Sequence, residues 1–257
     1  MNVSNTQLAI HISRTSVHVA EVLRSNQEII QQHDFELLES TPDAYKDKLK
    51  SFFNSLTTLK DEYPEYTMAW STPKQTLVPL SVYNESSSKS IFHLMFGESI
   101  DEKMIDFNRL MELSMVSVFE IPDWVKSFFI IKYPQIVFKH EHAMTLRALF
   151  QMGTFKRKIT VSFNDDYVNI TIIHKNELTF SNGFEYQTAE DVLYNLLFVL
   201  EQEGLTNEEG SLNFYFIDKK TENKAKQTIA LIEQLKPFKS IKISTIDSIL
   251  KLQTLCV

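Results

Sequence analysis

Glycine is scarce in this chain, since only 5 of its 257 residues are glycine. An average protein contains roughly 7% glycine, more than three times as much. Sites that hold phosphate groups use glycine where the backbone comes close to the ligand or adopts a positive φ. The shortage therefore counts against a nucleotide-binding site before any motif is considered.

Cysteine, positive charge and long apolar runs are also lacking. The single cysteine, Cys256, excludes an internal disulfide and a cysteine metal cluster, and its place one residue from the end does not favour a catalytic thiol. A net charge of −7 argues against nonspecific binding to nucleic acid or to an anionic membrane. Apolar runs such as residues 127–131 are too short to span a bilayer. Residues 1–10 lack a basic start followed by an apolar run, so we expect no signal peptide and a cytoplasmic protein.

Two stretches of the chain, residues 8–36 and 158–185, carry the same pattern of three consecutive strands. In both, apolar residues alternate with polar ones, which is typical of strands with one buried face. Matching positions lie 151 residues apart at first, as Ile10 and Val161 do, and 149 apart after the second turn. A repeat at half the chain length indicates two copies of one supersecondary unit.

A helix is expected after each three-strand stretch. Thr41-Pro42-Asp43 combines a capping hydroxyl, a first-turn proline and an acid, and Thr188 begins a second helix that Gly204 ends. The other expected strands are residues 66–70, 77–80, 115–121, 136–139, 212–217 and 241–246, and the other expected helices begin at Pro122 or cover residues 143–150, 220–235 and 247–255.

The segment from Lys74 to about residue 110 has no counterpart in the second half, so we predict an inserted subdomain there. Its residues 91–96 contain five large apolar side chains. Since successive residues of a helix advance by about 100°, a helix of this length cannot turn all five toward one buried face. We therefore predict a partner-binding surface that includes Phe92, Met95 and Phe96. The alternative is that the segment folds back on its own subdomain.

Three antiparallel strands, a crossover helix and parallel strands, present twice, resemble the actin-like ATPase fold. That resemblance implies an α/β protein of two ribonuclease-H-like domains with mixed sheets, covering residues 1–150 and 151–257. The order of elements is most similar to the pilus-assembly and cell-division branch, in which an extra subdomain used for partner contacts occupies the place of residues 74–110. The whole chain also resembles an uncharacterised bacterial family of degenerate actin-like proteins.

The phosphate-binding turns of that fold are altered in this sequence. Members that hydrolyse ATP carry an Asp-x-Gly turn after the first strand of each half, in which Asp handles magnesium and Gly lets amides approach phosphate. Here His11 and Ser13 occupy the two diagnostic positions of the first turn, and Ser162 and Asn164 occupy those of the second. The resemblance therefore implies an actin-like ATPase fold that lacks the usual nucleotide-binding site.

Further departures point the same way. Asp165 and Asp166 add negative charge where polyphosphate would lie. Ile217 is followed by no glycine in the expected adenosine turn, and the short connection before Leu212 leaves no room for the subdomain that helps to enclose the nucleotide. A ribonuclease-H-type nuclease is also excluded, because it needs a carboxylate where His11 stands.

Other candidate sites have simpler interpretations. His140 and His142 are expected on one face of a strand, at a spacing compatible with a metal but without a third ligand, so a polar strand edge is favoured. His11 and His18 are expected close together as ordinary sheet histidines. Glu190-Asp191 fits the first turn of a helix better than an acid pair in catalysis. We thus expect no catalytic residue, metal or cofactor.

Two functional hypotheses remain. The first is a non-catalytic actin-like scaffold, a pseudo-ATPase that acts through binding another protein. The alternative is a ligand-binding or weak ATP-binding and ATP-hydrolysing enzyme that uses substituted residues in the cleft between its domains. The turns at Ser13 and Asn164 distinguish the two.

Overall fold

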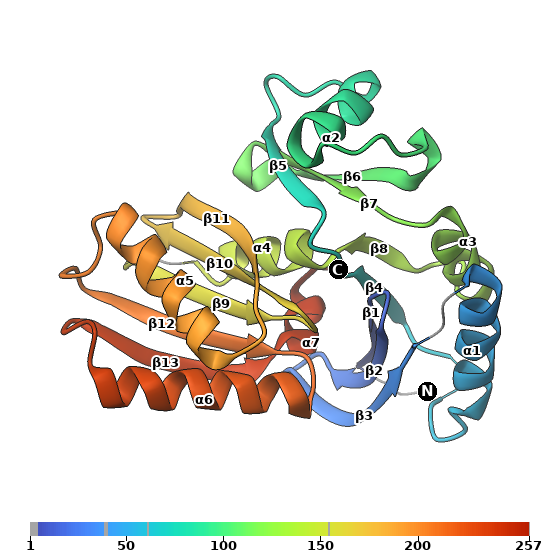
Figure 1. Cartoon of the computed structure of the whole chain (residues 1–257). Coiled ribbons are helices and arrows are strands. Elements are labelled where there is room, and N and C mark those ends of the chain that lie inside the picture. Colours follow the sequence, from blue (N-terminus) through green and yellow to red (C-terminus); the bar gives the residue numbers. More distant parts are fainter. Residues whose placement is uncertain (1–4, 39–40, 61, 154, 257) are drawn as a thin grey trace. The chain divides into compact units, whose positions relative to one another are not determined.

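The computed structural model describes residues 5–38, 41–60, 62–153 and 155–256 (Figure 1). The chain forms two compact units, of which the first contains the chain up to Ala148 and from Leu250 onward, and the second runs from Leu149 to Ile249. The sequence predicts a domain boundary after residue 150. The residues after Ile249, which the sequence places in the second domain, belong to the first unit.

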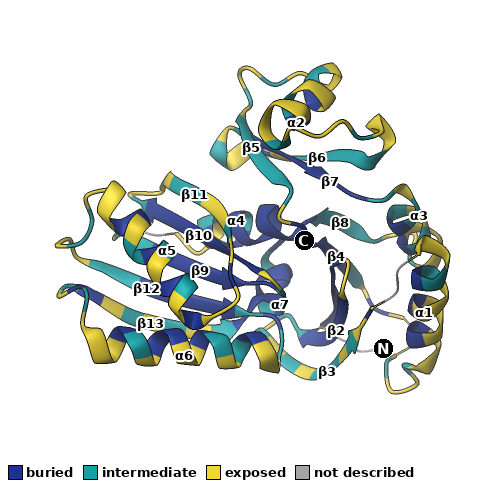
Figure 2. Ribbon diagram, in the orientation of Figure 1, coloured by how far each residue is buried: buried dark blue, intermediate teal, exposed yellow. Residues whose placement is uncertain are grey.

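The first unit is built on a five-stranded mixed sheet in the order β3-β2-β1-β4-β8. Strands β4 and β8 run parallel to β1, while β2 and β3 are antiparallel to their neighbours. Two helices, α1 and α3, bury their inner faces against one side of this sheet (Figure 2). The elements are β1 (Thr6–Ile12), β2 (Ser16–Leu23), β3 (Glu28–Glu36), α1 (Pro42–Ser55), β4 (Glu65–Trp70), α3 (Asp123–Lys132) and β8 (Val137–His140).

The second unit repeats this arrangement, with a sheet in the order β11-β10-β9-β12-β13. Helices α5 and α6 cover one face of the sheet with a core of aliphatic and aromatic side chains. The elements are β9 (Lys158–Phe163), β10 (Tyr167–His174), β11 (Glu177–Glu185), α5 (Ala189–Gln202), β12 (Gly210–Phe216), α6 (Lys219–Leu235) and β13 (Ile241–Ser248). Two helices cross the boundary between the units, α4 (Glu141–Gln151) and α7 (Ile249–Leu252).

The duplication predicted from the sequence is confirmed in detail. Ile10 pairs with Val19 in the first sheet, and Val161 pairs with Ile170 in the second, 151 residues later. Both sheets have a β-bulge at the equivalent position of their second strand, at Glu21/Val22 and at Ile172/Ile173. The offset falls to 149 because the second hairpin closes with a two-residue loop, whereas the first uses four residues, 24–27.

The repeat continues into the first helix of each unit. Helices α1 and α5 both have 14 residues and begin after a capping threonine, Thr41 or Thr188. Each threonine hydroxyl accepts a hydrogen bond from the amide three residues later, which satisfies an otherwise unpaired donor of the first turn. Leu49 and Leu196 occupy the same place in the two helices and are fully buried.

The inserted subdomain is larger than the sequence predicts. Strands β5 (Gln75–Pro79), β7 (Met115–Glu120) and β6 (Ile105–Leu110) form a separate antiparallel sheet in the order β5-β7-β6, and α2 (Ser88–Phe96) packs against it. The limit near residue 110 is wrong, because β7, predicted as part of the main pattern, pairs with both β5 and β6. Three 3₁₀ helices join these elements, η1 (Glu85–Ser87), η2 (Glu102–Met104) and η3 (Met111–Leu113).

The C-terminal segment closes the second face of the first sheet. The predicted final helix forms as α7 followed by the 3₁₀ helix η4 (Gln253–Cys256). The Gln253 amide donates to the carbonyl of Ile10 at 3.2 Å and accepts from the hydroxyl of Thr67 at 2.8 Å.

In the described part of the chain, no helix has both the length and the apolar character needed to cross a membrane.

Candidate functional site

The first altered turn connects β1 to β2 and is closed by its own serine. The Ser13 amide donates to the carbonyl of Ser16 at 2.9 Å. The Ser13 hydroxyl in turn accepts from the amides of Thr15 and Ser16, at 3.1 and 3.0 Å. Backbone amides of such a turn are the groups that would bind phosphate. In this protein those two amides already donate within the turn.

Arg14 lies at the tip of this turn but its charge is paired. Its guanidinium donates to the carboxylate of Glu120, a side chain that is only 5% exposed. Lys74 lies 3.7 Å from the other oxygen of the same carboxylate. The single cation at the first turn is therefore held by the inserted subdomain's last strand.

The second altered turn, between β9 and β10, has the same backbone hydrogen bond as the first, but its tip is acidic rather than basic. The Asn164 amide donates to the carbonyl of Tyr167 at 2.9 Å, as its counterpart Ser13 does in the first turn. Asp165 and Asp166 form the tip. Burial raises the pKa of Asp166, and the neighbouring Asp165 carboxylate raises it further. Holding this turn ionised is already costly, so a polyphosphate there would add to the repulsion.

A tyrosine hydroxyl fastens each turn from outside. Tyr45, on α1, donates to the carbonyl of Ser13, and Tyr186, just before α5, donates to the carbonyl of Asn164 at 2.9 Å. Both tyrosines are buried, at 6% and 8% exposure. Burial also raises the pKa of Tyr186, so its phenol remains a donor. The two turns are thus fixed rather than open loops.

The remaining predicted positions lie on the strands themselves. His11 on β1 and Ser162 on β9 are buried at equivalent places, where they pair with His18 and Asn169 of the next strand. The rings of His11 and His18 are 5.8 Å apart, as predicted for neighbouring sheet histidines.

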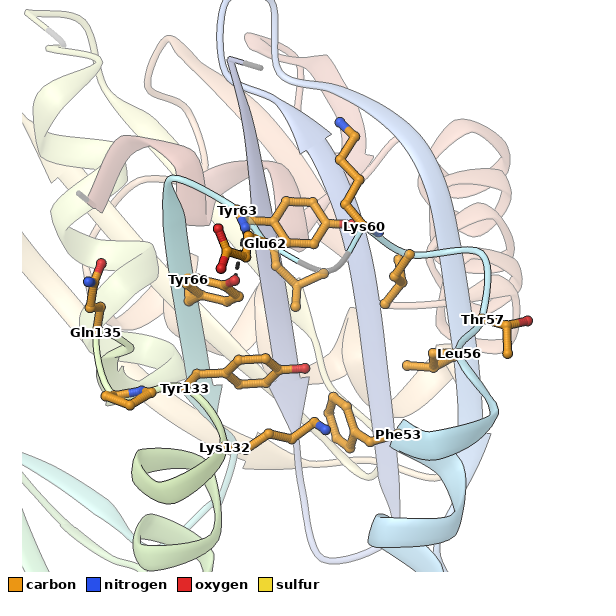
Figure 3. Close-up of a pocket in the computed structure, with 13 residues that line it drawn as sticks. Phe53, Leu56, Thr57, Lys60, Glu62, Tyr63, Tyr66, Lys132, Tyr133 and Gln135 are labelled. Carbon is orange, nitrogen blue, oxygen red and sulfur yellow. Dashed lines mark hydrogen bonds between the residues drawn. The ribbon is translucent and has the colours of Figure 1, made fainter. Parts of the chain in front are cut away.

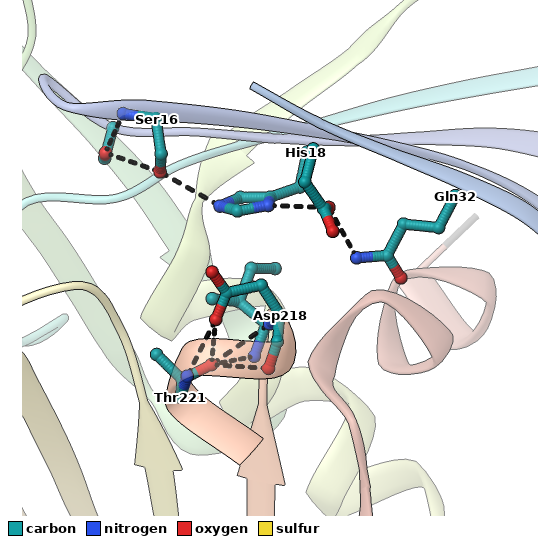
Figure 4. Close-up of polar contacts among 8 residues, drawn as sticks. Ser16, His18, Gln32, Asp218 and Thr221 are labelled. Carbon is teal, nitrogen blue, oxygen red and sulfur yellow. Dashed lines mark hydrogen bonds and ion pairs between the residues drawn. The ribbon is translucent and has the colours of Figure 1, made fainter. Parts of the chain in front are cut away.

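His18 takes part in a hydrogen-bonded relay that the sequence did not reveal (Figure 4). Its Nε2 lies 3.0 Å from the Ser16 hydroxyl and its Nδ1 lies 2.9 Å from the carboxylate of Asp34 on the next strand. Burial raises the pKa of Asp34, but hydrogen bonds from His18 and Gln32 outweigh that effect and lower it. The only signal in the sequence is the i, i+2 spacing of Ser16 and His18.

This relay has the connectivity of a Ser-His-Asp triad, yet its surroundings are those of a structural network. Ser16 is 5% exposed, and its hydroxyl also lies 3.1 Å from that of Ser13. A nucleophilic serine needs nearby amides to stabilise an oxyanion. The amides of Thr15 and Ser16 donate to the Ser13 hydroxyl instead. The relay therefore stabilises the first turn.

The helix that follows β12 is also closed by its own residues (Figure 4). The Thr221 hydroxyl accepts from the amides of Ile217 and Asp218, each at 3.0 Å, and the Thr221 amide donates to the Asp218 carboxylate at 2.8 Å. This is a reciprocal cap at the N-terminus of α6. These three amides, at the place where the fold would put an adenosine turn, already have partners.

The predicted strand containing both His140 and His142 is wrong. Strand β8 ends at His140 and α4 begins at Glu141, so the two histidines do not share a strand face. The His140 ring accepts from the His142 amide at 3.1 Å and contacts the Thr72 carbonyl at 3.1 Å, which gives both nitrogens a partner. Burial lowers the pKa of His140 to about 3 and that of His142 to about 4, so both are neutral. Among the described residues, no group of three His, Cys, Asp or Glu could hold a metal ion.

The predicted partner surface needs one correction. Phe92 is fully buried on the inner face of α2, and its ring centroid lies 4.6 Å from that of Phe96. Its assignment to an exposed surface is therefore wrong. The apolar run does leave exposed area, because Leu94 is 82% and Met95 is 55% exposed on the outer face of α2. A six-residue helical run thus divides between core and surface, as its periodicity requires.

A pocket of about 610 Å³ lies beside the first turn, within the first unit. Both tryptophans of the chain line it. The indole of Trp70 donates to the Glu120 carbonyl at 2.8 Å, and the ring of Trp124 stands edge-on to Tyr45 at 4.9 Å. Asp101, Lys103 and Met104, which belong to the inserted subdomain, also line it. The other lining residues are Arg14, Thr41, Pro42, Tyr45, Pro122 and Asp123.

The chain was compared with models of protein families and with solved structures. A family model described as "Protein of unknown function (DUF3822)" matches residues 1–235. Among solved structures, the chain is similar to a Bacteroides thetaiotaomicron protein with an actin-like ATPase fold and unknown function, at 19% identity, with 94% of this chain and 91% of that chain covered and a TM-score of 0.73.

Two other similarities are more distant. The PilM–PilN type IV pilus biogenesis complex is 12% identical, with 94% and 90% coverage and a TM-score of 0.57. The ethanolamine utilization protein EutJ from Carboxydothermus hydrogenoformans is 7% identical, with 97% and 87% coverage and a TM-score of 0.50. No curated protein matches the chain. At these identities the likeness establishes the fold, and the predicted actin-like ATPase fold is confirmed.

Proposed function

This chain belongs to the DUF3822 family of proteins of unknown function, and we propose that it is a non-catalytic actin-like scaffold that acts by binding another protein. The observation that carries this proposal is the Ser13 hydroxyl, which accepts from the two turn amides that a phosphate would need. The acidic tip at Asp165 and Asp166 and the cap formed by Asp218 and Thr221 support it.

On this proposal, the inserted subdomain contacts the partner. Leu94 and Met95 give α2 an exposed apolar face, and contiguous exposed apolar area often marks a contact site. The pocket between Trp124 and the subdomain residues Lys103 and Met104 offers a place for an apolar side chain. PilM, which shares this fold, occurs in a complex with PilN, and that likeness supports a protein partner. We further propose that the protein is cytoplasmic.

The loss of nucleotide binding is tested by thermal unfolding with Mg-ATP. A ligand at a hundred times its dissociation constant would stabilise the protein by about 2.7 kcal/mol, which raises the midpoint by a few degrees for a chain of this size. We expect millimolar Mg-ATP to leave the midpoint unchanged. A clear shift that Asp165→Arg or Ser13→Ala alters would instead favour the alternative of a weak ATP-binding enzyme.

The partner surface is tested by comparing two surface variants as bait. The double variant Leu94→Ser with Met95→Ser should fold normally, since exposed substitutions change stability by about 0.5 kcal/mol or less each. It should recover much less of the protein captured by the wild type. Ile131→Ser is the matched control, because Ile131 is 81% exposed on α3 of the same unit.

Retention of the captured protein by the double variant would contradict the α2 surface. Loss of capture by Ile131→Ser would contradict it as well, since a second apolar surface would then be responsible. Phe92 is unsuitable for this test, because its truncation would open a cavity in the subdomain core.

A further inference from the structure

A second pocket, of about 650 Å³, lies in the first unit away from both altered turns (Figure 3). Its walls come from the end of α1 and the loop after it, the residues before β4, and the end of α3. Leu8 and Tyr66, which line it, are paired near the starts of the parallel strands β1 and β4. The first turn follows Ile12 at the other end of β1, roughly 16 Å away along the strand. This pocket is therefore separate from the place where the fold would bind nucleotide.

Aromatic rings make up one side of this pocket. Tyr66 and Tyr133 are stacked, with centroids 4.8 Å apart and planes 23° apart, and Tyr63 meets Tyr66 edge-on at 5.8 Å. Phe53 lies across from Tyr133 at 6.2 Å. Flat faces of this kind favour an offset-stacked aromatic guest. The volume also falls within the range of about 300–1,000 Å³ that is typical of small-molecule sites.

Two lysines line the pocket, and one of them is already neutralised. The Lys60 ammonium pairs with the carboxylate of Glu21, which is only 3% exposed, and it also donates to the Thr6 hydroxyl at 3.1 Å. Lys132 has no carboxylate partner among the described residues. Its ammonium lies 5.5 Å from the ring centroids of both Phe53 and Tyr133. A cation held against aromatic faces at a pocket wall is placed to meet an anion.

The hydroxyl of Tyr133 supplies a neutral donor beside this cation. Figure 3 shows it pointing into the pocket, and it has no hydrogen-bond partner among the described residues. The Tyr63 hydroxyl is engaged, since it accepts from the Lys60 amide at 3.1 Å and hydrogen-bonds to the Glu21 carboxylate. The Tyr66 hydroxyl accepts from the Tyr63 amide at 2.8 Å. Burial raises the pKa of Tyr133, so its phenol stays protonated and can donate a hydrogen bond to an anion.

We propose that this pocket binds a small aromatic carboxylate, with its ring against Tyr66, Tyr133 and Phe53 and its carboxylate between the Lys132 ammonium and the Tyr133 hydroxyl. Among the described residues that line the pocket, Glu62 is the one acid, and it is exposed, so solvent weakens its repulsion of the bound anion. Leu8, Leu56 and Leu59 complete an apolar surface suited to the body of the ring.

Titration calorimetry with benzoate tests this proposal on the full chain. Benzamide has the same shape without the charge, and cyclohexanecarboxylate has the charge without the flat ring. We expect benzoate to bind with saturation below about 10 mM. Benzamide should bind at least about 10-fold more weakly, because a charge-assisted hydrogen bond contributes about 1.5–3 kcal/mol. Cyclohexanecarboxylate should bind about 2- to 10-fold more weakly, because aromatic pairing contributes about 0.5–1.5 kcal/mol.

Two conservative variants identify the groups. Lys132→Met keeps the stem and should weaken benzoate binding about 10-fold or more, and Tyr133→Phe keeps the ring and should weaken it about 3- to 10-fold. Lys89→Met, which removes an exposed charge on α2, is the control and should change nothing. Absence of saturable benzoate binding, equal binding of benzamide, or unchanged binding by Lys132→Met would each overturn the proposal. None of these outcomes depends on Mg-ATP or on the captured partner, so the scaffold proposal stands or fails separately.

Discussion

The two altered turns share a backbone and differ in chemistry. Each begins with an amide that donates to the carbonyl three residues later, from Ser13 to Ser16 and from Asn164 to Tyr167. The tip of the first is Arg14-Thr15, whereas the tip of the second is Asp165-Asp166. The hydrogen bonds that shape the turn have been kept while the groups that would meet a phosphate have been replaced. Turn geometry therefore depends on the sheet, and ligand chemistry is a separate property.

The tyrosines that fasten the turns extend this comparison. Ser13 and Asn164 are 151 residues apart, as the repeat requires, but Tyr45 and Tyr186 are only 141 apart. One tyrosine comes from within α1 and the other from the residue that follows β11. Both carbonyls are buried and need a donor. The two halves have met the same requirement from different positions in the chain.

The residue pairs between the second and third strands of the two sheets differ more in their chemistry than the turns do. His18 pairs with Asp34 across strands β2 and β3, and the equivalent pair in the second unit is Asn169 and Gly183. A Cβ atom on Gly183 would lie 3.2 Å from the Asn169 side chain, so the second pair has little room for a larger residue. A hydrogen-bonded relay in one copy corresponds to close packing in the other.

Truncation of the equivalent helix leucines is the strongest test of the repeat. Leu49→Ala and Leu196→Ala remove fully buried side chains from the same place in α1 and α5. Each should lower the free energy of unfolding by about 3–4 kcal/mol, through lost burial and a residual cavity. Urea unfolding measures both. If one variant loses less than about 1 kcal/mol, the two helices do not have equivalent roles in their cores.

Removal of the tyrosine hydroxyls compares the two turns directly. Tyr45→Phe and Tyr186→Phe each leave a buried turn carbonyl without its donor, so each should cost about 1–2 kcal/mol. The same urea titration applies, with Tyr194→Phe as control because Tyr194 is 68% exposed on α5. A cost of Tyr194→Phe equal to the others would show that the hydroxyl bonds to the turns are not the source of the effect.

Charge removal near the two turns should act in opposite directions. The pKa of Asp34 is lowered, so its ionised form stabilises the folded state above its ordinary pKa, and that contribution is lost as pH falls through the lowered value. The pKa of Asp166 is raised above its reference value of 3.8, so its ionised form destabilises the folded state at neutral pH, and the penalty disappears as pH falls toward 3.8.

At pH 7, Asp34→Asn should therefore destabilise the protein and Asp166→Asn should stabilise it. Each change should be about 0.5 kcal/mol, since both groups are partly exposed and screened. Thermal unfolding from pH 3 to pH 7 measures both, and each difference from the wild type should shrink toward pH 3. Equal signs at pH 7 would refute the electrostatic contrast between the turns.

Much of the fold could be predicted because it is local or periodic. The strand alternation, the threonine caps and the shift of the repeat from 151 to 149 are all properties of neighbouring residues, and they agree with the sheet registers. The membership of β7 could not be predicted, because its pattern fits either sheet and only long-range pairing decides. The helix start at Glu141 was missed because His140 and His142 fit a strand and a helix start equally well.

The site was less predictable than the fold. The sequence showed which residues replace the diagnostic positions, but not that the Ser13 hydroxyl would accept from the turn amides. The His18–Asp34 contact joins strands through a register that a bulge displaces, so residue spacing alone gives no signal for it. Both pockets combine residues from helices and loops far apart in sequence, and such combinations arise only from packing.

The smallest expected effect concerns the hairpins that change the offset of the repeat. In the two-residue loop of the second unit, Lys175 has φ +53°, and in the four-residue loop of the first, Gln27 has φ +59°. Asparagine tolerates this left-handed region better than lysine or glutamine does, and it keeps the Cβ atom, so the entropy of the unfolded chain changes little.

Lys175→Asn should raise the free energy of unfolding by roughly 0.3 kcal/mol and Gln27→Asn by about half as much. The difference arises because a two-residue loop requires a positive φ at both of its residues, whereas a longer loop can share the change among several. Urea midpoints of the two variants, measured in parallel on the full chain, show which substitution stabilises the protein more. A larger gain at Gln27 would mean that the four-residue loop, not the shorter one, is the more constrained hairpin.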